Sequence, residues 1–251
     1  MKGLLLRVGI DKTAGGYNAP INPLTNDYLY MPIPETIPES EESPKQIFRQ
    51  GMETTYTQMD THFSKFTEQN AIELAFPEHL RLRDCCHLDP DFENLTYGDQ
   101  ASGRGNRVRE LDVGDFIAFF ASFRPIIPCD HLLVYALYGI FFIDDIKKAK
   151  DISSDQWHVN AHTRIQKMNG EHLIAFADKS RSGRFRHAIP IGEYRNGAYR
   201  ITNKILDAWG DIGVKDGFIQ RSVCPPWFTK PDQFLKWLDF QQVKLINNNW
   251  E

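Results

Sequence analysis

The sequence predicts a single α+β domain built around a mixed or mainly antiparallel, barrel-like sheet with a C-terminal helix. Strand-like apolar runs, such as residues 116–123, outnumber convincing amphipathic helices. A hydrophobic fraction of 41% beside 25% charged residues is typical of a globular protein. A chain of 251 residues can bury one large core, so we expect residues 1–251 to form one domain.

Composition also argues against several protein classes. The longest apolar stretch, residues 132–143, is too short to span a bilayer, so we expect no membrane partner. Residues 4–6 are apolar but Arg7 interrupts them, which is unlike a signal peptide. The four cysteines lack a Cys-x-x-Cys pattern, which favours reduced thiols in a cytoplasmic protein. A net charge of −4 argues against wholesale electrostatic attraction to nucleic acid.

The first predicted strand covers residues 4–10, and we expect it to share a sheet with residues 116–123. It leads into a loop that contains Asp11, a candidate catalytic carboxylate, and the paired glycines Gly15 and Gly16. Paired glycines let backbone amides approach a phosphate closely. The spacing fits neither a Walker loop nor a dinucleotide fingerprint, so an ordinary turn capped by Asp11 is the favoured interpretation.

Residues 35–70 are expected to form an irregular insertion. Residues 35–42 are acidic and contain proline and serine, as surface loops do. The aromatic and methionine residues of 48–68 have near-helical spacing, which is more typical of packing than of a cofactor site.

An imidazole and two carboxylates, groups able to transfer protons or bind metals, lie close together in Cys86-His87-Leu88-Asp89-Pro90-Asp91. Pro90 excludes a helix interior and favours extended backbone before it. In an extended run His87, Asp89 and Asp91 point to one face, where they could transfer protons or bind a metal. The alternative is a turn in which the carboxylates cap backbone amides.

The next segments combine a polar loop with two apolar strands. Residues 97–107 are expected to form a flexible loop in which Arg104 either binds phosphate or is merely solvated. Residues 116–124 and 131–143 read as strands joined to Gly-Asp and Asp-Asp turns. This order is similar to a PUA-like β-barrel, the architecture of several modified-base readers, although function depends on the site rather than the fold.

His158 and His162 are spaced so that they share one face of a helix, which suits zinc or iron. No glutamate follows His158, so the metalloprotease motif is absent. With His87 and Asp89 they could complete a site of histidines and a carboxylate for a divalent metal. The alternative is a pair of solvent-facing or structural histidines.

A predicted strand at residues 173–177 precedes a basic loop, residues 179–187. Its phosphate-binding candidates are Lys179, Arg181 and Arg184, with Phe185 as a stacking surface. Arg184 is the strongest candidate, because a guanidinium can hold two phosphate oxygens at once. We expect this loop to share one cleft with Asp11, His87 and Asp89, unless it is only solvated. An amphipathic helix at residues 232–243 should close the core.

Taken in order, several motifs make the sequence resemble the nucleotide modification associated domain 3 family. The most specific is His87-Leu88-Asp89-Pro90-Asp91, and the others are the Asp11–Gly16 loop, Met31-Pro32-Ile33-Pro34, Gly114-Asp115-Phe116, His158-x-x-x-His162 and Gly183-Arg184-Phe185. The resemblance implies a context in bacterial or phage systems that modify DNA bases, with nucleotides or nucleic acid and other proteins of such a system as partners. It implies no particular reaction.

Three functional hypotheses follow. The first is an enzyme that modifies a nucleotide or a base in nucleic acid, with His87, Asp89 and Asp91 as acid/base or metal groups. The second is a non-catalytic module that binds a modified base or nucleic acid. The third, a scaffold subunit of a modification complex, is least favoured, because three polar groups on one strand edge are costly for a scaffold.

Overall fold

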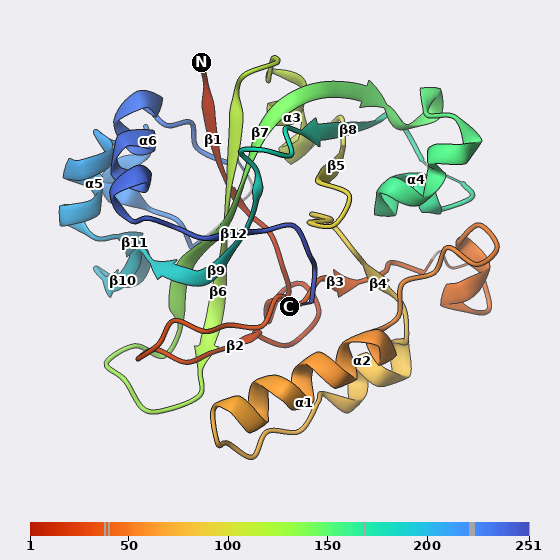
Figure 1. The fold of residues 1–251 in the computed structure, drawn as a ribbon, viewed down its shortest axis with the longest axis horizontal. Helices are drawn as coiled ribbons and strands as arrows, with labels where there is room; N and C mark the ends of the chain where they lie inside the picture. The colour runs from red at the N-terminus through yellow and green to blue at the C-terminus, as the bar shows by residue number, and fades with distance from the viewer. Residues whose placement is uncertain (38, 40, 168, 221–223, 251) are drawn as a thin grey trace.

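A mixed β-sheet occupies the centre of the chain (Figure 1). The computed structural model describes residues 1–37, 39, 41–167, 169–220 and 224–250. Strand β1 (Gly3–Arg7) runs parallel to β6 (Phe116–Pro125), and β6 runs antiparallel to β7 (Val134–Lys148). The N-terminal strand and the aromatic strand therefore lie in one sheet, which confirms that prediction.

The strand order of this sheet is β1-β6-β7-β8-β5, and β2, β9 and β12 pair alongside this path. The remaining strands are β2 (Pro20–Ile21), β3 (Ile33–Pro34), β4 (Cys86–His87), β5 (Thr96–Gln100), β8 (His172–Ala177), β9 (Gly183–Pro190), β10 (Gly192–Arg195), β11 (Ala198–Ile201) and β12 (Leu245–Ile246). No pairing among the described residues closes the sheet into a barrel. The mixed sheet and the α+β class are confirmed, whereas the barrel-like, PUA-like form is not.

The helices surround the sheet. They are α1 (Asp60–Gln69), α2 (Glu78–Arg83), α3 (Asn106–Arg109), α4 (Ala161–Arg164), α5 (Asn203–Trp209) and α6 (Pro231–Phe240), with 3₁₀ helices η1 (Pro44–Ile47), η2 (Tyr56–Met59), η3 (Gly103–Gly105), η4 (Ala149–Asp151), η5 (Ser154–Val159) and η6 (Lys215–Gly217). Across the described ranges, every helix is too short or too polar to traverse a lipid bilayer. The segment 35–70, expected as an irregular insertion, contains η1, η2 and α1.

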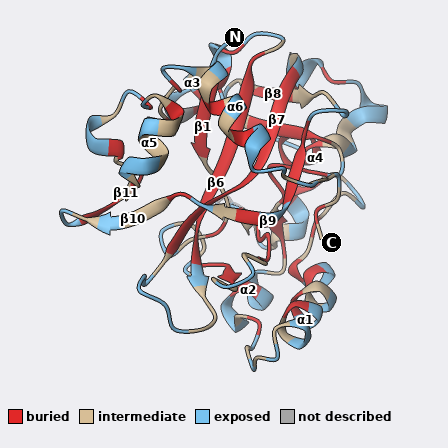
Figure 2. Cartoon of the chain, turned by 60° about the vertical axis from the view of Figure 1, so that its left-hand side comes forward, coloured by how far each residue is buried: buried red, intermediate tan, exposed pale blue. Residues whose placement is uncertain are grey.

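Both faces of the sheet are buried, and Figure 2 shows its central strands almost wholly covered. In β1, Leu4 and Leu6 join one hydrophobic cluster and Leu5 joins the other, because side chains alternate along a strand. Helices α5 and α6 cover the Leu5 face, while α1 and α2 pack on the opposite side. A sheet covered on both faces explains why β6 and β7 read as continuous apolar runs.

Helix α6 matches the amphipathic helix expected near the C-terminus. Pro231 occupies its first turn, where a missing backbone N–H costs no hydrogen bond. Phe234 and Leu238, one turn apart, are buried, and the Phe234 ring stacks on Phe116 of β6 with centroids 5.4 Å apart. The helix ends at Phe240, three residues before the predicted end.

Two segments predicted as loops form regular structure instead. Residues 97–107 contribute most of β5, then η3 and α3. Much of the basic segment 179–187 lies in β9, which pairs with both β7 and β12. Both strands have polar, turn-rich sequences, and their pairing partners lie far away in the chain. Local sequence patterns therefore did not predict them.

Candidate metal centre

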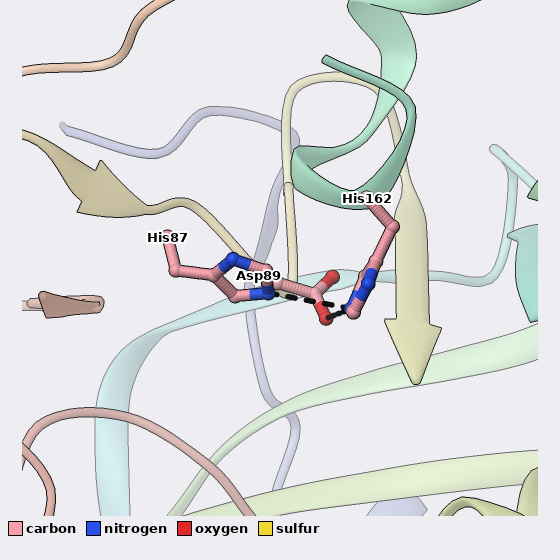
Figure 3. A group of neighbouring side chains, drawn as sticks. All are labelled: His87, Asp89 and His162. Carbon is pink, nitrogen blue, oxygen red and sulfur yellow. Dashed lines mark hydrogen bonds and ion pairs between the residues drawn. The ribbon is translucent and has the colours of Figure 1, made fainter. Parts of the chain in front are cut away.

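Three side chains far apart in the sequence meet beside β5 (Figure 3). His87 ends β4, Asp89 follows two residues later, and His162 comes from α4. The His87 and His162 Nε2 atoms are 3.3 Å apart, and His162 Nε2 lies 3.7 Å from Asp89 Oδ2. All three potential ligand atoms lie within 4.8 Å of one another. We call this group the His-Asp cluster.

The pairing of β3 with β4 orients the His87 ring. Ile33 lies opposite His87 in this short ladder, which brings Glu35 beside the ring. Glu35 Oε2 is 2.9 Å from His87 Nδ1. The carboxylate oxygen accepts a hydrogen bond, so we assign the imidazole hydrogen to Nδ1, which donates to Glu35. The lone pair of Nε2 then faces His162 and Asp89.

A second histidine sets the orientation of His162. His172 Nε2 lies 3.0 Å from the carbonyl oxygen of Asn169, to which only an N–H can donate. In neutral His172 the Nδ1 atom therefore accepts, and His162 Nδ1 donates to it across 2.6 Å. The Nε2 lone pair of His162 consequently faces the Nε2 lone pair of His87. Two lone pairs at 3.3 Å repel each other unless a cation or a proton lies between them.

Asp89 is fixed by β5 and by Asn160. The Gly98 amide donates to both carboxylate oxygens at 2.9 and 3.1 Å, and Asn160 Nδ2 donates to Oδ1 at 2.9 Å. Burial nevertheless raises the pKa of Asp89 to about 7, since these donors only partly replace water. Gly98 also permits close packing, because a Cβ at this position would lie 2.2 Å from His162 Cδ2.

Asn160 links the two halves of the cluster. It is fully buried and forms the N-cap of α4, where its Oδ1 accepts from the His162 amide at 2.9 Å. Its Nδ2 donates to Asp89 and, at 3.1 Å, to Thr96 Oγ1. One amide side chain therefore positions both the imidazole of α4 and the carboxylate that follows β4.

The electrostatic environment of the cluster favours a positive charge. Burial disfavours the His87 imidazolium, yet the carboxylates of Glu35, Asp89 and Asp99 outweigh burial and raise the pKa of His87. Burial alone would raise the pKa of Glu35, but the neighbouring His87 outweighs burial and lowers the pKa of that carboxyl below its usual value. Three carboxylates around two imidazoles make this a cation-binding environment.

The donor set fits a divalent transition metal. Two imidazole nitrogens and one carboxylate form the combination that holds non-haem iron, and zinc takes the same ligand types. Ligand atoms about 2.1 Å from one ion lie up to about 4.2 Å apart, which covers the 3.3 and 3.7 Å separations. Glu35 and His172 supply the outer hydrogen bonds that orient metal-binding histidines.

The structure brings together His87, Asp89 and His162 but separates His158 from them. His158 is exposed in η5, and its carbonyl accepts from Arg164 Nε. The shared helix face required one continuous helix, and this segment is not one, because Asn160 has extended backbone and begins a new helix. Spacing of i and i+4 brings side chains together only within one continuous helix.

Asp91 and Asp11 act as turn caps. Asp91 is fully buried, accepts from the amides of Glu93 and Asn94, and pairs with Arg164. Asp11 pairs with Arg7 at 2.9 Å and caps the amides of Thr13 and Ala14 at 2.7 Å. For both residues the turn interpretation holds, and neither belongs to the His-Asp cluster.

The glycines of the Asp11 loop face a histidine. The carbonyl of Gly15 lies 2.9 Å from His79 Nε2, and a Cβ at Gly16 would contact the same ring at 3.4 Å. Both glycines have positive φ, which accounts for their use in this turn. Their phosphate-binding role stays a prediction, and the side chain of Arg104 in η3 lies outside the described part of the chain.

The basic segment around β9 does not present the predicted surface. Phe185 is 1% exposed and packs in the core, so it offers no stacking face. The Arg181 guanidinium lies over the Phe142 ring at 3.8 Å. Asn247 Nδ2 donates to the Lys179 carbonyl. Arg184 is 2% exposed and lines a cavity with α1 rather than with the His-Asp cluster.

Four supporting residues escaped the sequence analysis: Glu35, Gly98, Asn160 and His172. Asn160 carried a readable signal, because Asn160 and Thr163 form a capping box at the start of α4. The others reach the cluster through strand pairing, as Glu35 does through the β3–β4 ladder.

The chain is similar to a known protein family. The family model of nucleotide modification associated domain 3 matches residues 2–236, which include the whole His-Asp cluster. Comparisons with curated proteins and with solved structures find no match. Because the family model covers most of the chain, the protein belongs to the nucleotide modification associated domain 3 family.

Proposed function

We propose that this protein is a metal-dependent enzyme that modifies a nucleotide or a base in nucleic acid. The observation that carries this proposal is the convergence of His87 Nε2, His162 Nε2 and the Asp89 carboxylate within 4.8 Å. The name of the family supports a nucleotide-related substrate. Membership in a bacterial or phage system that modifies DNA bases is the finer form of the proposal.

Each residue of the site would have a distinct task. His87, His162 and Asp89 would bind the ion, which supplies Lewis-acid or redox chemistry at its open positions. Glu35 and His172 would keep the Nδ1 hydrogens in place, so that both Nε2 atoms stay available. The His87 and His162 side chains are 16% and 11% exposed, so neither imidazole is wholly sealed from solvent.

Metal analysis of the purified protein tests the proposal. We expect about one transition-metal ion per chain by mass spectrometry, and this measurement also identifies the metal. His162→Ala should lose the ion, because it removes one of three ligands. His158→Ala is the matched control, since His158 is exposed four residues away and lies outside the cluster. Equal metal content in both variants, or none in the wild type, contradicts the proposal.

Activity is tested on free deoxynucleotides and on DNA from bacteria or phages. Substrate mass is compared before and after incubation with wild type and with Asp89→Asn. Turnover that depends on Asp89 supports the enzyme, whereas binding of a modified base without any mass change favours the non-catalytic module.

A further inference from the structure

A polar cavity lies apart from the His-Asp cluster, between α1, β9, residues 27–30 and the C-terminal segment. Its volume is about 250 Å³. Three cationic side chains line it, Lys65, Arg184 and Arg186, together with the rings of Tyr30, His62 and Trp250. We call it the cationic cavity. Nothing in the proposed function uses it.

The charge of this cavity is positive although the chain as a whole is negative. Lys65 and Arg186 are exposed, and neither forms an ion pair with any described residue. The one carboxylate in the wall, Asp27, already pairs with His187 at 2.9 Å and accepts from Thr25 Oγ1. Arg184 is buried at the inner end, where its Nε donates to the Asn248 carbonyl. The cavity therefore suits an anion.

The aromatic side of the cavity suits a planar ring. Trp250 is half-buried, and its ring is near-parallel to Tyr30 at 6.3 Å and 23° and to His62 at 6.1 Å and 28°. Tyr30 is held by a 2.7 Å hydrogen bond from its hydroxyl to the Pro90 carbonyl. Aromatic side chains next to cationic ones form the usual platform for a base and its phosphate.

We infer that the cationic cavity binds one nucleotide, with its base against Trp250 and its phosphate at Lys65 and Arg186. Ligand pockets usually have volumes of roughly 300–1,000 Å³, so 250 Å³ favours a single nucleotide over a dinucleotide cofactor. The inference rests on the proposed function for its substrate class. It adds a place where that substrate is recognised away from the metal.

The two sites are joined through the chain segment that follows Asp89. Asn249, in the cavity wall, donates to Asp91 at 2.9 Å, and Tyr30 donates to Pro90. A nucleotide in the cavity would therefore lie behind the loop that carries the Asp89 carboxylate. A nucleic-acid strand could place one nucleotide here and another at the His-Asp cluster.

Binding measurements on the full-length chain test this inference. The ligands are thymidine monophosphate and a single-stranded oligothymidylate, titrated by calorimetry at several salt concentrations. The double variant Lys65→Ala, Arg186→Ala should weaken binding of the preferred ligand at least tenfold. With the oligonucleotide it should also reduce the salt slope by about 0.7, since both side chains contact one phosphate and each neutralised single-strand phosphate contributes about 0.7. The matched control is Lys204→Ala, Lys236→Ala, which removes two exposed lysines from α5 and α6.

Trp250→Leu gives a second test, because loss of a stacking surface should weaken binding by about tenfold. Tighter binding of the oligonucleotide indicates a strand, and equal binding of both ligands indicates a free nucleotide. Absence of binding, or equal affinity in the cavity and control variants, overturns the inference.

His162→Ala separates the two proposals: it should lose metal yet keep nucleotide affinity, whereas the cavity variants should keep the metal. If Trp250→Leu fails to fold, the two surface substitutions still decide the question.

Discussion

The His-Asp cluster and the cationic cavity differ in how their polar groups are held. In the cluster, each ligand has a partner that fixes it: Glu35 for His87, His172 for His162, and Asn160 for Asp89. In the cavity, Lys65 and Arg186 extend into solvent without an ion pair among the described residues. Fixed groups suit chemistry that requires defined geometry, whereas exposed cations such as Lys65 and Arg186, unpaired within the described part of the chain, suit attraction of a charged substrate.

The largest expected effect follows from Gly98→Ala. The new methyl group would lie 2.2 Å from His162 Cδ2 and 2.6 Å from Asn160 Oδ1, so α4 must move away from Asp89. We expect loss of metal binding and a fall of about 1–3 kcal/mol in the free energy of unfolding. Metal analysis and denaturant unfolding measure the two effects.

Gly139→Ala serves as the control for this substitution. Its Cβ would meet the Phe92 ring at 2.8 Å, so it should cost similar stability in the core. Metal binding should survive in this variant. If both glycine variants kept the metal, the close packing of Gly98 against His162 would not matter for the site.

A smaller effect is expected from Glu35→Gln. The pKa of His87 is raised by the Glu35 carboxylate against the opposing effect of burial, so removing the charge should lower that pKa. Loss of an outer-shell partner typically reduces metal affinity about 10–100-fold. NMR titration of the imidazole and competition with a chelator measure these changes. Glu42→Gln, an exposed substitution, is the control and should change neither quantity.

The smallest expected effect is a pH dependence of metal binding at the His-Asp cluster. Burial raises the pKa of Asp89 to about 7 from an ordinary 3.8, so the metal-free folded state binds this proton more tightly than the unfolded state. The stability that Asp89 contributes is complete below the unfolded value and is lost as pH rises through about 7. A metal competes with that proton, so its affinity should rise by up to about tenfold per pH unit below 7.

Thermal unfolding with and without metal checks this pH dependence. The rise in Tm on adding metal should be larger at pH 8 than at pH 6. A larger rise at pH 6 would show that the Asp89 carboxylate is not a ligand. Asp89→Asn, which cannot titrate, should reduce the difference between the two pH values, and the part that remains is due to His87, whose raised pKa also makes a proton compete with the metal.

The parts of the fold that depend on local sequence patterns were predictable from the sequence. The apolar runs of β1, β6 and β7 and the spacing of Phe234 and Leu238 in α6 were readable, because burial requires apolar residues at fixed periods. The strand β9 was not readable, since glycine and charged residues suit a loop until β7 and β12 pair with it. The strands that pair with β9 lie about 40 to 60 residues away along the chain. Local propensity carries no information about partners at that distance.

Sequence patterns predicted the family, the shared sheet of β1 and β6, and the segment that contains His87 and Asp89. The grouping of side chains in the His-Asp cluster depends on contacts between distant parts of the chain. Asp91 and Asp11 turned to cap backbone amides, while His162 joined His87 across 75 residues. The physical reason is that side-chain partners are chosen by strand pairing and helix capping. Those contacts bring Glu35, Asn160 and His172 to the cluster from elements that sequence spacing cannot relate.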